Sequence, residues 1–168
     1  AISFYLYGIS YKGNFDNITK ETNEYKIRVI GSNISLDRFY LDVDPVSVIK
    51  ELIKLSKPNE NEKIIFVWPE GIIPGVSQNQ LKEYKWLFEN QFNKNHLLAI
   101  GINSKEDENK NIKYFNSLSI FDHDLNVINS YKKINLVPFG EFLPFEKLLK
   151  SIGLKTITNN YQSYSKGE

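Results

Sequence analysis

Two acids in this sequence stand where a carboxylate could bind a ligand or take part in catalysis. The first, Glu70, follows the apolar run Ile64–Trp68 and Pro69, which cannot donate to a sheet. This run predicts a strand buried on both faces, with Glu70 just past its carboxyl end. Ligands gather at that edge of an α/β sheet. A solvated loop acid is the alternative interpretation, because most glutamates are exposed.

The second acid, Glu141, lies in the segment Lys132–Pro144. Two prolines and a glycine within seven positions exclude a regular helix or a central strand there. The segment is nevertheless rich in large apolar residues, and buried loop backbone needs hydrogen-bond partners. It is therefore either a connector packed on the core or part of a functional site.

Together the two segments resemble a known enzyme family. The order Trp-Pro-Glu, Tyr-x-Lys and Leu-Val-Pro-Phe-Gly-Glu-Phe-x-Pro is similar to that in bacterial apolipoprotein N-acyltransferases. These are membrane enzymes whose periplasmic part is a nitrilase (carbon–nitrogen hydrolase) domain. The resemblance runs from about Tyr25 to the end of the chain. It implies an α/β fold, the nitrilase-type α-β-β-α sandwich, in incomplete form.

The resemblance assigns three residues to catalysis. In nitrilase-type enzymes a glutamate takes the proton of a cysteine thiol, the thiolate forms a thioester, and a lysine stabilises the oxyanion. Glu70 corresponds to the base, which needs a carboxylate whose pKa is raised by burial. Lys133 corresponds to the oxyanion lysine, and Glu141 to a second acid that orients it. We therefore expect Glu70 and Lys133 to lie within about 3–6 Å of each other.

The resemblance also implies substrates and a location. The family transfers an acyl chain from the sn-1 position of a phospholipid to the diacylglyceryl-cysteine of an apolipoprotein, at the periplasmic face of the bacterial inner membrane. Tyr40, Trp68 and Phe139 correspond to substrate-binding positions. Tyr40 or Phe39 replaces a family tryptophan that shapes the acyl pocket. In the family's Gln-Pro-Asn-Ile turn, Asn33 matches the asparagine, whereas Gly31 replaces the glutamine.

The chain contains no cysteine, and in the family the nucleophile lies downstream of the position that matches residue 168. We therefore expect a partial domain that is inactive and poorly soluble when expressed alone. Two other interpretations stay open: a fragment of a soluble nitrilase or amidase that releases ammonia, and a non-catalytic remnant of the fold.

Composition excludes several classes of protein. With 21 basic and 20 acidic residues, the chain offers no electrostatic basis for binding nucleic acid. The absence of cysteine and the presence of two histidines argue against a zinc site, so we expect no metal and no cofactor. No apolar run approaches the roughly 18 residues of a membrane span, so membrane attachment is expected through segments absent from this chain.

The expected domains are 1–24, an arm or linker that follows a lost membrane bundle, and 25–168, a partial carbon–nitrogen hydrolase domain. Residues 1–10 are either a strand, a frayed arm or the trace of a membrane helix. In the first half of the chain, the sequence predicts a strand over 26–30 and a helix after Asp44 with an apolar stripe that ends at Leu55. A capping box at Ser77 and Gln80 then precedes a helix over about 81–92.

In the second half, the sequence predicts a strand over 96–102 that starts at a structural His96, and a solvated loop over 104–113. A hairpin of 114–121 and 125–131 follows, and then a solvated Lys132. The chain is expected to end with a helix over 144–152 and a flexible tail.

Overall fold

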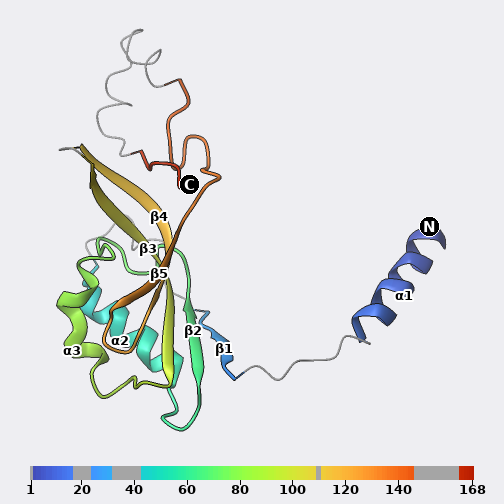
Figure 1. Ribbon diagram of the computed structural model, residues 1–168, viewed down its shortest axis with the longest axis horizontal. Helices are drawn as coiled ribbons and strands as arrows, with labels where there is room; N and C mark the ends of the chain where they lie inside the picture. The colour runs from blue at the N-terminus through green and yellow to red at the C-terminus, as the bar shows by residue number, and fades with distance from the viewer. Residues whose placement is uncertain (1, 17–23, 32–42, 109–110, 146–162) are drawn as a thin grey trace.

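The computed structural model describes residues 2–16, 24–31, 43–108, 111–145 and 163–168. The predicted α/β class is confirmed. The elements, in chain order, are α1 (Ile2–Asp16), β1 (Lys26–Val29), α2 (Pro45–Ser56), β2 (Ile64–Trp68), the 3₁₀ helix η2 (Leu81–Tyr84), α3 (Lys85–Phe88), β3 (His96–Glu108), β4 (Asn111–Phe121) and β5 (Val127–Lys132) (Figure 1).

One five-stranded sheet organises the domain, with the strands in sequence order. β1, β2 and β3 run parallel, whereas β4 and β5 continue the sheet antiparallel. α2 and α3 lie together on one side of this sheet (Figure 1). The described residues therefore form one sheet and one helical layer of the predicted α-β-β-α sandwich.

α2 begins where the sequence predicts. The Asp44 carboxylate accepts hydrogen bonds from the backbone N–H groups of Val46 (3.1 Å) and Ser47 (3.2 Å), and a proline occupies the first turn. The predicted apolar stripe is buried at Val48, Ile49, Leu52 and Ile53. Its last member, Leu55, is exposed, which corrects that part of the prediction.

β2 alternates between two environments, so the prediction that both its faces are buried is wrong. Ile64, Phe66 and Trp68 are fully buried under the helices, but Ile65 and Val67 are only half-buried. The reason is that no described element covers the other face of the sheet. On that open face the edge strand β1 presents Ile27 and Val29, which are 70% and 72% exposed.

The predicted helix over 81–92 is broken into η2, α3 and a turn. The helical backbone ends after Phe88, because Glu89 is extended (ψ 135°) and Asn90 follows in a left-handed conformation (φ 64°). The apolar stripe is still buried, because the turn folds Phe92 back beside Phe88. Half of the predicted capping box is present, since Gln80 Oε1 accepts a hydrogen bond from the Ser77 N–H (3.0 Å).

The predicted solvated loop over 104–113 is wrong. β3 continues to Glu108 and returns as β4 from Asn111, so this tract is a two-stranded ribbon with Lys105 opposite Tyr114. The backbone ladder supplies the hydrogen bonds, and charged side chains on an exposed ribbon stay in solvent. Lys132 is not merely solvated either, because its ammonium lies 2.6 Å from Glu106 Oε1.

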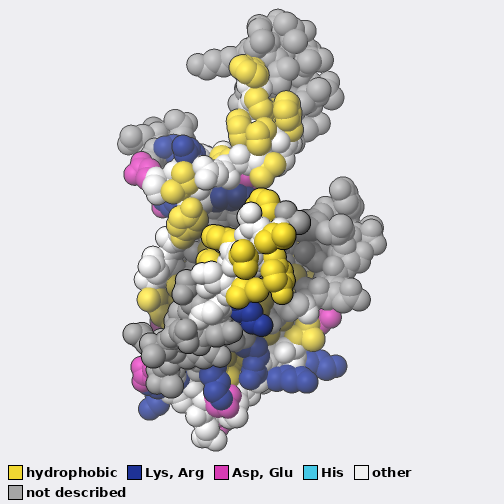
Figure 2. Space-filling view, turned by 90° about the vertical axis from the view of Figure 1, so that its right-hand side faces the viewer, with side chains coloured by type: hydrophobic (Ala, Val, Ile, Leu, Met, Phe, Trp, Pro, Cys, Tyr) yellow, Lys and Arg dark blue, Asp and Glu magenta, His cyan; other side chains and the backbone are white. Residues whose placement is uncertain are grey.

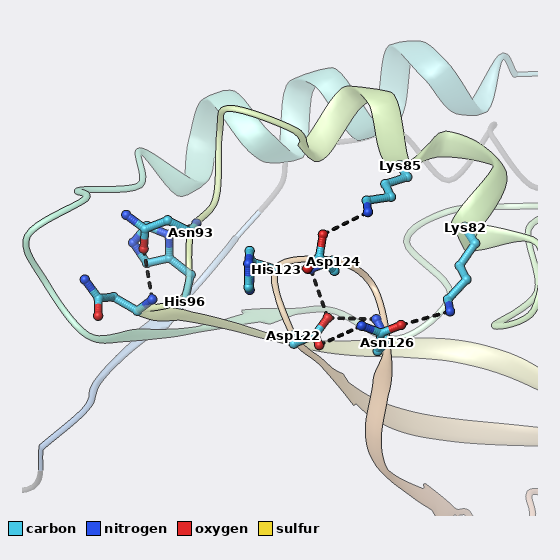
Figure 3. A network of polar contacts seen from close by, with 9 residues as sticks. Lys82, Lys85, Asn93, His96, Asp122, His123, Asp124 and Asn126 are labelled. Atoms are coloured by element: carbon cyan, nitrogen blue, oxygen red, sulfur yellow. Dashed lines mark hydrogen bonds and ion pairs between the residues drawn. The ribbon is translucent and has the colours of Figure 1, made fainter.

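The predicted hairpin turn between β4 and β5 is confirmed. Asp122 accepts hydrogen bonds from the backbone N–H groups of Asp124 (2.9 Å) and Asn126 (2.8 Å). Asp124 pairs with Lys85, and Asn126 accepts from Lys82, which ties the turn to the helical layer (Figure 3).

His96 has the structural role expected of it. It is buried at the start of β3, and its Nδ1 accepts a hydrogen bond from the Asn93 N–H at 3.0 Å.

Residues 2–16 form a helix, so the strand interpretation of the first ten residues is wrong. The side chains described for α1 (residues 2–13) are exposed, and the helix lies apart from the sheet (Figure 1). Within the described part of the chain, no helix combines the length and apolar character needed to cross a membrane. Of the predicted helix over 144–152, only Pro144 and Phe145 are described, and they form a turn. The expected positions at Tyr40 and Asn33 fall outside the described residues.

Candidate active site

Glu70 is positioned by a close approach between β3 and the segment that leaves β2. The Gly71 N–H donates to the carbonyl of Gly101 (3.1 Å) in β3. A Cβ added at Gly101 would lie 2.5 Å from the Cα of Glu70, a distance that no side chain tolerates. A glycine in β3 therefore allows the Glu70 backbone to rest directly on the strand.

Glu141 is held by its own loop. Its Oε2 accepts a hydrogen bond from the Val137 N–H (2.7 Å), while its backbone N–H donates to the Val137 carbonyl (2.8 Å). The left-handed conformation of Phe139 (φ 63°) makes this tight turn possible. The loop thus satisfies its polar groups around a carboxylate that is only 11% exposed.

Asn116 in β4 joins the two acids. Its Nδ2 donates to Glu70 Oε1 (2.5 Å) and to Glu141 Oε1 (2.6 Å). Sequence analysis missed this residue. Its one local signal is an asparagine in a strand otherwise rich in β-branched and aromatic residues, where asparagine is uncommon.

Lys133 completes the cluster. Its ammonium donates to Glu141 Oε1 at 2.9 Å and lies 3.8 Å from Glu70 Oε1, within the interval expected from the sequence. Its backbone N–H donates to the Asn116 carbonyl (2.8 Å), which anchors it to β4. The structure therefore brings Glu70, Lys133 and Glu141 together at one end of the sheet.

Electrostatics favour the charged forms of the Lys133–Glu141 pair. The hydrogen bond to Glu141 raises the pKa of Lys133 above its ordinary value. Burial pushes the pKa of Glu141 upward, but hydrogen bonds from Lys133, the Val137 N–H and Asn116 outweigh burial and hold this pKa below its ordinary value. Lys133 is therefore an ammonium, and Glu141 a carboxylate, at neutral pH.

Glu70 faces a pocket of about 640 Å³, called here the Glu70 pocket. Its side chain is 63% exposed, so the burial expected for the base is not supplied by the described residues. The lining residues are Glu70, Gly71, Ile73, Pro74, Gly75, Val76, Gly101, Ile102, Asn103, Asn116, Glu141 and Tyr164.

Tyr164 belongs to the site although the sequence predicted a flexible tail there. Its N–H donates to the Glu141 carbonyl (2.8 Å), and the Gly167 N–H donates to the Lys133 carbonyl (3.0 Å). Burial raises the pKa of Tyr164, although a hydrogen bond with the Asn103 side chain lowers it in part. Residues 163–168 therefore pack against the site instead of trailing into solvent.

Two residues expected to bind substrate, Trp68 and Phe139, do not line the Glu70 pocket. Trp68 is 1% exposed, and its indole N–H donates to Ser56 Oγ (3.0 Å) on the helical side of the sheet. Trp68 is thus a core residue among the described elements, and its expected role in substrate binding stays a prediction. Phe139 is exposed with Val137 and Phe145 on the loop after β5, where hydrophobic side chains gather at the top of Figure 2.

The arrangement can do two kinds of chemistry. Glu70 is an exposed carboxylate that can accept a proton from a group entering the pocket, and Lys133 is a cation beside it that can stabilise an anionic oxygen. In the part of the chain that the structure describes, no group of three or more His, Cys, Asp and Glu side chains could hold a metal ion.

Comparison with known proteins points to a class of acyl-transferring enzymes. The chain is similar to apolipoprotein N-acyltransferase from Agrobacterium fabrum, at 30% identity over 140 residues that cover 78% of the chain and 26% of that protein. It is 27% identical over 143 residues to apolipoprotein N-acyltransferase from Bradyrhizobium diazoefficiens, covering 79% of the chain and 26% of that protein. The chain thus resembles the apolipoprotein N-acyltransferases over most of its length and spans about a quarter of theirs.

No family model matches the chain. Among solved structures, it is similar to a variant amidase of the nitrilase superfamily from Nesterenkonia AN1. The TM-score is 0.43 at 13% identity, over 73% of this chain and 47% of that one.

Proposed function

We propose that this chain is part of the catalytic domain of an apolipoprotein N-acyltransferase, with residues 25–168 contributing a partial carbon–nitrogen hydrolase domain. The observation that carries the proposal is the convergence of Glu70, Lys133 and Glu141 on Asn116, all within hydrogen-bond or ion-pair distance. The similarity to acyltransferases over most of the chain supports the same assignment.

Glu70 acts as the general base in this proposal. It takes the proton of a cysteine thiol supplied from outside these 168 residues, and the thiolate attacks the sn-1 ester carbonyl of a phospholipid. Lys133 stabilises the tetrahedral oxyanion. The C–O bond then breaks, the lysophospholipid oxygen takes the proton from Glu70, and an acyl-thioester remains.

The second half of the cycle uses the same residues. The α-amine of a diacylglyceryl-cysteine attacks the thioester carbonyl, and Glu70 takes a proton from that amine. The C–S bond breaks and the thiolate recovers its proton. Glu141 holds Lys133 in place and in its charged form, and so acts as a positioning residue. This chain has no thiol and is inactive alone.

The remaining parts of the proposal concern location. The site works at the periplasmic face of a bacterial inner membrane, with phospholipid as donor and apolipoprotein as acceptor. Residues 1–24 are an arm that follows a membrane bundle.

The test compares Lys133→Met with Lys132→Met in a protein that carries the missing thiol. Lys133 lies at the site, whereas its neighbour pairs with Glu106 on the ribbon. Lys133→Met should slow acyl-thioester formation about 10²–10³-fold, since one oxyanion donor is worth that much. Lys132→Met should leave the rate near that of the parent, and equal effects of the two changes would refute the proposal.

A further inference from the structure

A second pocket adjoins the Glu70 pocket. It has a volume of about 340 Å³, and its polar lining comes from Ser77, Gln80, Asn103, Lys105, Tyr114 and Tyr164. We call it the Lys105 pocket. Asn103 and Tyr164 also line the Glu70 pocket, so the two spaces share a wall.

The Lys105 pocket has the opposite charge character to its neighbour. Two carboxylates, of Glu70 and Glu141, line the Glu70 pocket, but no acidic residue lines the Lys105 pocket. No hydrogen bond or ion pair joins the Lys105 ammonium to any residue that the structure describes. The Lys105 ammonium is therefore a solvated positive charge beside a pocket that has no negatively charged lining residue.

The other polar groups of this pocket can donate hydrogen bonds. Ser77 uses both its N–H and its Oγ to donate to Gln80 Oε1, which leaves the amide NH₂ of Gln80 as the group still able to bond. Tyr114 and Tyr164 each add a hydroxyl. A cation surrounded by neutral donors is suited to an anion with several oxygen atoms.

We propose that the Lys105 pocket is a phosphate subsite. On the function proposed above, on which this assignment rests, it holds the phosphate of the phospholipid donor while the donor's ester lies in the Glu70 pocket. A glycerophospholipid carries both groups on one glycerol unit, and the shared wall of Asn103 and Tyr164 places the two pockets side by side. A soluble phosphate ester offers the same chemistry without acyl chains.

The test is a ³¹P NMR titration of the chain with dihexanoylphosphatidylglycerol kept below its micelle concentration, and in a second arm with glycerol 3-phosphate. Lys105→Gln should weaken phospholipid binding roughly three- to tenfold. Lys54→Gln makes the same charge change at an exposed lysine of α2 and should not weaken binding. Equal losses in both variants, or none in Lys105→Gln, would overturn the subsite.

The second arm identifies the source of the phosphate. If glycerol 3-phosphate binds as tightly and with the same dependence on Lys105, the subsite stands and its ligand is a soluble ester. Binding needs neither thiol nor turnover, so a failure of acyl transfer leaves this result intact. The opposite result is also distinguishable. If thioester formation depends on Glu70 but phospholipid binding does not change in Lys105→Gln, the proposed function stands and the phosphate subsite is refuted.

Discussion

Gly101 in β3 and Glu70 beyond the end of β2 are in such close contact that a Cβ on Gly101 would lie 2.5 Å from the Glu70 Cα. Gly101→Ala should therefore displace Glu70 and destabilise the fold by about 1–3 kcal/mol, the usual cost of overpacking. The free energy of unfolding in urea measures this effect. Gly31→Ala is the control, because a Cβ there meets nothing within 4 Å and should change stability by no more than about 0.5 kcal/mol. An equal effect at the two glycines would contradict the close contact.

Asn116 should tolerate no acid in its place. Asn116→Asp removes the donor shared by Glu70 and Glu141 and adds a third negative charge between them. The expected loss is about 1–3 kcal/mol of unfolding free energy. Asn129→Asp, at an exposed position of β5, is the matched control and should be close to neutral. A neutral Asn116→Asp would mean that the amide does not hold the two acids together.

Stability should depend on pH through the Lys133–Glu141 pair. The pKa of Glu141 is lowered in the folded state, so its contribution is present above the ordinary carboxyl pKa of 4.5 and is lost as pH falls through the folded-state value. The pKa of Lys133 is raised, so its contribution is present below 10.5 and is lost as pH rises through its folded-state value. The stability difference between the parent and Glu141→Gln should be largest between these limits. A difference that does not change from pH 7 to pH 2 would contradict this account.

The open face of the sheet should make the isolated chain associate. Ile27 and Val29 are largely exposed on the edge strand β1, beside the half-buried Ile65 and Val67. Light scattering after size exclusion should find oligomers for the parent and a shift toward monomer for the double change Ile27→Lys and Val29→Lys. Leu55→Lys on the helical layer is the control and should leave association unchanged. A monodisperse parent monomer that unfolds cooperatively would contradict association through this face of the sheet.

Local sequence patterns predicted the parts of the site that depend on local backbone. Glu70 follows a short apolar strand ended by Pro69. The prolines and glycine around Glu141 exclude a helix or central strand there, although the turn itself depends on the left-handed Phe139. Asn116 and Tyr164 were missed because their partners lie far away in the sequence. An asparagine within a strand is too weak a local signal to identify Asn116.

The errors in the fold have similar causes. The ribbon between Ser104 and Lys113 is almost entirely polar or charged, so it shows no apolar alternation, and cross-strand pairing makes it a sheet. The helix over 81–92 ends early because the backbone is extended at Glu89 and left-handed at Asn90, which periodicity does not reveal. β2 was expected to be buried on both faces because its apolar run is continuous, but no described element covers the face that carries Ile65 and Val67.

Replacing Glu70 by Gln tests the central claim most directly. The measurement is the rate of acyl-thioester formation from phospholipid in a protein that carries the missing thiol, with Glu51→Gln, at an exposed glutamate of α2, as control. Gln keeps the shape of the side chain but cannot take the thiol proton. The account predicts a loss of about 10²–10⁴-fold in Glu70→Gln with folding retained, and a rate near that of the parent in Glu51→Gln. A Glu70→Gln protein that forms the thioester at the parental rate and yield would contradict the assignment of Glu70 as the base.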